Sequence, residues 1–139
     1  MTERKQDRPE LKRLNRQAVD IDFDGGTLTS DGGLVLLREV DRTLDLIRRI
    51  DEAIPDPRDP LYTSHAQAEI LTSRIFGIAA GYEDGNDHQE LRHDSAFQVA
   101  AGRTPAQNDY HDEHGPLASP STHSRFENRI DAKTIFKLH

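Results

Sequence analysis

Histidines set among acidic residues are the first groups in this chain whose types could do chemistry. His111 and His114 flank two acidic residues, and His88 and His93 lie among further acids. A metal site needs three or four ligands that converge at about 2 Å, and none of the usual ligand spacings is present. We interpret these histidines as solvated surface groups and predict no metal site, with metal binding as the alternative.

A second acidic cluster follows Tyr82. Glu83, Asp84 and Asp87 could hold Mg²⁺ for phosphodiester chemistry. We favour a structural interpretation, in which Tyr82 anchors a loop and the acids cap the following helix at its positive end. Phosphate-loop, nucleophile-elbow and H-E-x-x-H patterns are absent from the sequence. We therefore predict no catalytic residue and no cofactor in this chain.

The segment 120–128 is the candidate for contact with nucleic acid. Its side chains are of types that hydrogen-bond to phosphates or base edges. Together with the segment 131–139, it could form part of a helix-turn-helix. The alternative is a polar helix face that is simply solvated. The predicted DNA-binding residues are Ser121, Thr122, Ser124, Arg125, Asn128, Lys133 and Lys137.

Charge is distributed unevenly along the chain. The net charge is −7, yet residues 1–18 carry +3 and residues 116–139 carry +2, whereas 19–60 and 61–115 each carry −6. An acidic surface repels phosphate, so we expect any DNA contact at the two ends. There is no cysteine, which excludes disulfides and thiolate zinc sites. No apolar run is long enough for a membrane span and no secretory signal is recognisable, so we predict a cytoplasmic protein.

The pattern of apolar residues predicts a mainly α fold. Alternation over 19–23, a Gly-Gly turn and the segment 27–29 predict a short N-terminal β hairpin. Helices are expected over 34–50, with a break near 43–45, and over 64–80, packed on each other. The first apolar stripe comprises Leu34, Leu37, Val40, Leu44, Ile47 and Ile50, and the second comprises Ala68, Leu71, Ile75, Ile78 and Ala79.

Shorter elements complete the expected small helical domain. Helices are predicted over 87–91, 94–101 and 120–128, and another begins at Asp131. We divide the chain into a disordered basic arm (1–18), a helical domain (19–102), a linker (103–116) and an incomplete helix-turn-helix-like segment (117–139).

Six short sequence pieces follow one another along the chain: LTSDGG (28–33), IPDPR (54–58), FGIAAGYED (76–84), Asn86-Asp87, Leu91-Arg92 with Asp94, and Leu117-Ala118-Ser119 with 125–128. Each piece alone is weak, but six in order over about 100 residues are specific. In this order, they resemble the N-terminal region of a DDE transposase from bacterial insertion sequences, of the group called IS-thirteen-eighty.

The resemblance implies a helical module associated with transposon-end recognition and assembly. The family's catalytic carboxylates sit on a ribonuclease-H-like fold that binds divalent metal. None of the acids here falls on those positions, so the resemblance implies that the chain is truncated before that core and inactive alone, with Mg²⁺ belonging to the missing core. The implied partners are transposon-end DNA, bound weakly by this chain, and a second copy or full-length transposase. The alternatives are a regulatory module that binds full-length transposase and poisons assembly, and an independent metal-dependent nuclease.

Overall fold

The computed structural model describes residues 28–103 and 115–136, and the regular elements of this part of the chain are all helices, with no strand. The mainly α prediction is therefore confirmed. The helices are α1 (Leu34–Leu44), α2 (Leu46–Ala53), α3 (Gln67–Ala79), α4 (His88–Leu91), α5 (Ser95–Ala100), α6 (Pro120–Arg129) and α7 (Ala132–Phe136), with 3-10 turns η1 (Pro60–Tyr62) and η2 (Gly85–Asp87).

The predicted N-terminal β hairpin is not seen. Its first strand, at 19–23, and its turn lie outside the described residues, as does the basic arm. Leu28 and Thr29, which were expected in the returning strand, are described and are not in a strand. The Thr29 hydroxyl instead accepts a hydrogen bond from the backbone N–H of Asp31 at 3.0 Å. A local turn of this kind competes with strand pairing for the backbone groups.

The first predicted helix is broken in two, as expected near 43–45. Asp45 takes a left-handed conformation with φ of 60°, and the Asp41 carboxylate accepts from the N–H of Ile47 at 3.0 Å. The break redirects the apolar stripe, because the two helices no longer share one axis. Leu34, Leu37, Ile47 and Ile50 contribute to the core, whereas Val40 and Leu44 are exposed, contrary to the prediction.

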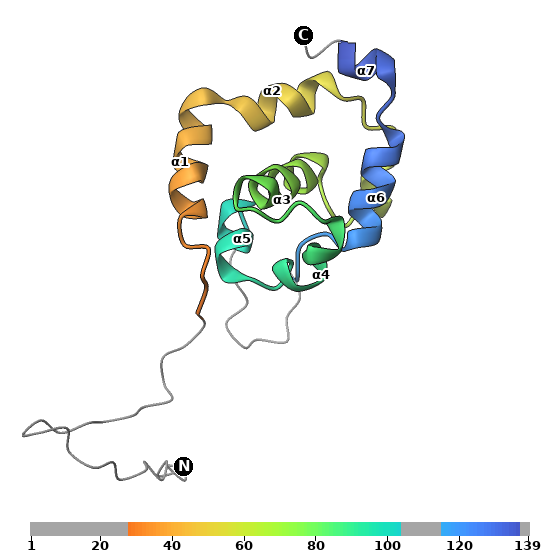
Figure 1. Cartoon of the computed structure of the whole chain (residues 1–139). Coiled ribbons are helices and arrows are strands. Elements are labelled where there is room, and N and C mark those ends of the chain that lie inside the picture. The colour runs from red at the N-terminus through yellow and green to blue at the C-terminus, as the bar shows by residue number, and fades with distance from the viewer. Residues whose placement is uncertain (1–27, 104–114, 137–139) are drawn as a thin grey trace, which may run out of the picture.

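Helix α3 occupies the centre of the fold and contacts α2, α5 and α6 (Figure 1). Leu71 is buried as predicted, but Ile78 is half exposed at 51%. The predicted single buried face was too narrow, because neighbours cover this helix from more than one side. The further buried residues of α3 are Gln67, Ile70, Ser73, Phe76 and Gly77.

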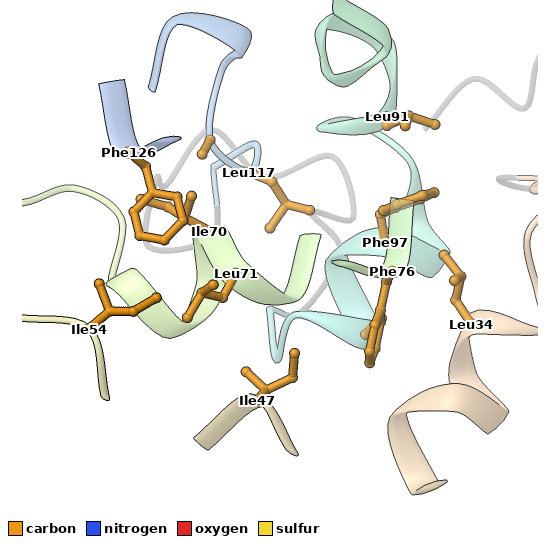
Figure 2. Close-up of a cluster of buried hydrophobic side chains, with 12 residues drawn as sticks. Leu34, Ile47, Ile54, Ile70, Leu71, Phe76, Leu91, Phe97, Leu117 and Phe126 are labelled. Atoms are coloured by element: carbon orange, nitrogen blue, oxygen red, sulfur yellow. The ribbon is translucent and has the colours of Figure 1, made fainter. Parts of the chain in front are cut away.

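The hydrophobic core joins early and late parts of the chain (Figure 2). Leu117 is 1% exposed and Phe126 is 4% exposed, and both belong to the same cluster as Ile70 and Phe97. The N–H of Leu117 donates to the carbonyl of Arg92 at 3.0 Å. Residues after the predicted linker therefore pack with those before it. The proposed division into segments stays a prediction.

Arg103 ties together the two ends of the predicted linker, of which residues 104–114 lie outside the described part. Its guanidinium donates to the carbonyl of Gly115 at 2.8 Å and to the carboxylate of Glu69 at 2.8 Å. A planar guanidinium can make several such bonds at once. Both ends of this segment are thereby attached to the start of α3.

Candidate nucleic-acid interface

Helix α6 has one buried face and one exposed polar face. Pro120 occupies its first turn, where the missing N–H costs no helix hydrogen bond. Ser119 precedes the helix but makes no side-chain cap; its hydroxyl contacts those of Ser121 and Thr122 at 3.0 and 3.1 Å. His123 and Phe126, three residues apart, point into the core. The exposed polar side chains on the opposite face of α6 are thus available to a partner.

The predicted DNA-binding residues lie mostly on the surface. Thr122 is half-buried, and Lys137 lies outside the described residues. Arg125 reaches toward the Ser121 hydroxyl, with Nη2 and Oγ 3.5 Å apart. The structure thus brings Arg125, Ser121 and Thr122 together near the start of α6. The exposed members of the predicted set are Ser121, Ser124, Arg125, Asn128 and Lys133.

An open pocket of about 600 Å³ separates α6 from the segment between α2 and α3. The wall that contains Arg58 was not predicted, because only the fold brings the segment between α2 and α3 to α6. Its lining residues are Arg58, Asp59, Tyr62, Thr63, Ser64, His65, Ile70, Thr122, Arg125, Phe126 and Arg129.

One carboxylate lies between two of the pocket arginines. Asp56 pairs with Arg58 through two hydrogen bonds, at 2.8 and 2.6 Å, and its Oδ1 lies 3.5 Å from Nη1 of Arg129. The hydrogen bond from Arg58 is the main cause that lowers the pKa of Asp56 to about 2. Two guanidinium charges therefore share one negative charge.

Arg129 and Arg125 differ in how strongly the protein holds them. Arg129 donates to the side-chain oxygen of Gln67 at 2.6 Å and stacks over the Phe126 ring, 5.3 Å from its centroid. Arg125 is exposed and forms no ion pair with any described residue. Arg129 is a fixed wall of the pocket, whereas Arg125 is free to meet an anionic ligand.

Two histidines that the sequence placed on the surface or on a polar helix are in the interior. His88 and His123 are each 1% exposed, so the surface prediction is wrong for His88; His93 is exposed as expected, and His111 and His114 lie outside the described residues. His123 therefore cannot face DNA.

The buried histidines are held without charge. Burial is the main cause that lowers the pKa of both, to about 3 for His123. The Ser73 hydroxyl lies 3.3 Å from Nε2 of His123, while Nε2 of His88 and Nδ1 of His123 have no hydrogen-bond partner among the described residues. A neutral ring suits this environment, since a charged ring would be desolvated with few partners.

The acidic loop behaves as a structural element. The Asp84 carboxylate accepts from the N–H of Asn86 at 2.9 Å, which caps η2 as predicted. The Tyr82 hydroxyl donates to Asp31 at 2.9 Å, and its ring packs edge-on against Phe97 with centroids 6.0 Å apart. Tyr82 therefore anchors this loop both to the segment that leads into α1 and to α5.

The described residues offer no metal centre. Within 28–103 and 115–136, no group of three or more histidine, aspartate or glutamate side chains could hold a metal ion. These residues do not fit the divalent metals on which DDE chemistry depends.

The chain belongs to the family of transposase DDE domain group 1, whose family model matches residues 11–139. The family carries out DNA transposition, so this chain is a DDE transposase family domain. No curated protein and no solved structure matches the chain. None of the helices in the described ranges is both long and apolar enough to cross a lipid bilayer.

Proposed function

We propose that this chain is the DNA-end-binding and assembly region of a DDE transposase of the insertion-sequence group IS-thirteen-eighty, without catalytic activity of its own. The observation that carries the proposal is Arg125, an exposed guanidinium without an ion pair among the described residues. It lies at the rim of a pocket that two further arginines line. DNA backbones are bound chiefly through such cations.

The surroundings of Arg125 support the same proposal. Ser121, Ser124 and Asn128 lie on the exposed part of the same helix, and hydroxyl and amide groups bind phosphates and base edges. Lys133 is exposed on α7, directly after α6. The elements from 19 to 115 are acidic in sum. We therefore propose that α6 and α7 face DNA as a helix-turn-helix, with Lys137 adding to the contact.

Duplex binding measured by fluorescence anisotropy tests this function. The full chain should bind weakly, near the common non-specific range of about 10⁻⁴–10⁻⁶ M, with a strong salt dependence. Arg125→Ala should weaken binding and reduce the slope of log affinity against log salt by about one unit. Arg49→Ala is the matched control, because Arg49 is also exposed but lies on α2. If deletion of residues 1–18 abolishes binding while Arg125→Ala leaves it intact, the N-terminal arm is the contact and α6 is not.

A second function has its own support on α1. Leu36, Val40 and Leu44 recur at four-residue spacing and are 72%, 51% and 58% exposed, so they form an apolar stripe on the solvent side of this helix. Such a stripe suits a non-catalytic module that binds full-length transposase. Sedimentation of the chain mixed with full-length transposase distinguishes the two functions: Val40→Lys should abolish a complex that uses this stripe and leave DNA binding unchanged.

A further inference from the structure

The 3-10 turn η1 presents an aromatic ring to solvent from a well-held backbone. Tyr62 is 88% exposed and its neighbour Leu61 is 87% exposed. The Asp59 carboxylate accepts from the N–H of Leu61 at 3.0 Å, and the Asp59 carbonyl accepts from the Thr63 hydroxyl at 2.7 Å. The turn is thus fixed by side-chain bonds while its ring makes almost no contact. A tyrosine presented in this way is suited to stacking on a ligand.

Tyr62 shares its pocket with the arginines of α6. The volume of about 600 Å³ lies within the usual range of about 300–1,000 Å³ for small-molecule sites. Tyr62 and Arg58 come from the segment before α3, whereas Arg125 and Arg129 come from α6. Guanidinium groups and an exposed aromatic ring therefore line the same pocket.

The combination of ring and cations indicates a nucleotide. Guanidinium groups bind phosphate, and an aromatic side chain stacks on a base face. In a duplex, both faces of every interior base are already covered by neighbouring bases. A base that stacks on a protein ring must therefore be single-stranded or extruded from the helix. An apolar protein segment would gain little from the arginines.

We propose that this pocket binds an unpaired nucleotide of a DNA strand, with the base stacked on Tyr62 and the adjoining phosphate held by Arg125 and Arg129. The proposal rests on the proposed DNA-binding function and adds its substrate class, which is a DNA end or junction with exposed bases. Arg125 closes on the phosphate from the solvent side, and Arg129 remains fixed against Phe126.

Anisotropy titrations of the full chain with three probes test the proposal. The probes are a blunt duplex, the same duplex with a short single-stranded overhang, and that duplex with an abasic overhang. Stacking contributes about 1–3 kcal/mol per base, so the overhang duplex should bind about 5-fold to 150-fold more tightly than the blunt duplex. The abasic overhang should lose this preference, because it keeps the phosphates and removes the stacking base.

Substitutions on η1 distinguish the contribution of the Tyr62 ring to binding from that of the rest of the turn. Tyr62→Ala should remove the preference for the overhang, Tyr62→Phe should retain it, and Leu61→Ala is the control for an equally exposed neighbour without a ring. Both side chains are almost fully exposed, so we expect these variants to fold like the unchanged chain. Arg125→Ala should weaken binding to all three probes.

The outcomes distinguish the two proposals. Equal binding of blunt, overhang and abasic probes would overturn the unpaired-nucleotide site and leave DNA binding intact. Failure to bind any probe would overturn both. An overhang preference that survives Tyr62→Ala would overturn the stacking role. A change in sedimentation of the chain alone on Tyr62→Ala, with no change in DNA preference, would assign Tyr62 to self-association and would also overturn it.

Discussion

His88 and His123 stack on each other in the interior, with ring centroids 4.0 Å apart and ring planes inclined by 28°. They attach α4 to α6, and α3 closes the site, since Gly77 approaches the His88 ring and Ser73 contacts His123. This stack positions the helix that carries Arg125. The orientation of the proposed DNA-binding face thus depends on two uncharged rings.

The buried histidines make the stability of the chain depend on pH. The pKa values of both histidines in the folded chain are lowered from 6.5, to about 3 for His123. Below pH 6.5 the unfolded chain therefore binds more protons than the folded chain. The contribution of His123 is complete above pH 6.5 and is lost as pH falls from 6.5 toward 3, and the lowered pKa of His88 acts in the same direction. We expect His123 to lower the free energy of unfolding by about 1.4 kcal/mol per pH unit within this window, as measured by urea denaturation from pH 7.5 to 4.5.

Substituting single histidines tests whether the buried histidines cause the dependence of the unfolding free energy on pH. His123→Gln should reduce the dependence of unfolding free energy on pH by about one proton. His93→Gln is the control, because His93 is exposed and takes no part in the buried stack. A His123→Gln slope equal to that of the natural chain would show that His123 is protonated in the folded state.

The close approach of Gly77 to His88 predicts that a larger residue at position 77 destabilises the protein. A Cβ at position 77 would lie 3.3 Å from Cε1 and Nε2 of His88, whose ring is confined by His123. Gly77→Ala should therefore destabilise by about 1–3 kcal/mol through overpacking, despite the better helix propensity of alanine. Gly33→Ala is the control, since its Cβ would meet nothing within 4 Å. Equal denaturation midpoints for the two variants would show that the His88 ring moves freely.

The central position of α3 predicts that truncating its buried Leu71 side chain destabilises the protein. Leu71 is 5% exposed, and Leu71→Ala should lower the free energy of unfolding by about 2–5 kcal/mol because it leaves a cavity. Leu36→Ala, at a side chain that is 72% exposed, should change it by no more than about 0.5 kcal/mol. Chemical denaturation of both variants measures the difference. A loss below about 0.5 kcal/mol for Leu71→Ala would mean that α2 does not pack on α3 in solution.

The sequence predicted local structure better than tertiary contacts. The turn at Asp45, the cap at Asp84 and the helix that begins at Pro120 follow from signals within a few residues. The exposure of Val40 and Leu44 does not follow from such local signals. Hydrophobic periodicity cannot show that a helix break turns the second half of an apolar stripe toward a different neighbouring helix.

The candidate site was predicted only in part, because local signals identify single residues but not the tertiary contacts that bring them together. Arg125 was identified because it lies on a polar helix near other hydrogen-bonding residues. Arg58 and Tyr62 were not, since only the fold brings the segment before α3 to α6. The burial of His88 had one local signal in retrospect: Gly77 lies inside a helix, where a missing side chain permits close approach.

Asp56 provides the sharpest test of the arginine pocket, because removing its charge should improve DNA binding. The single negative charge of Asp56 is shared between Arg58 and Arg129, so Asp56→Asn should raise the positive charge at the pocket, tighten binding severalfold and steepen the salt dependence. Asp45→Asn is the matched control: it removes the same charge beside Arg48 on the α1–α2 turn, and asparagine tolerates the left-handed backbone there. Anisotropy titrations at several salt concentrations compare the two. Equal gains would indicate an effect of net charge alone, whereas a gain confined to Asp56→Asn would place the bound phosphate beside Arg58 and Arg129.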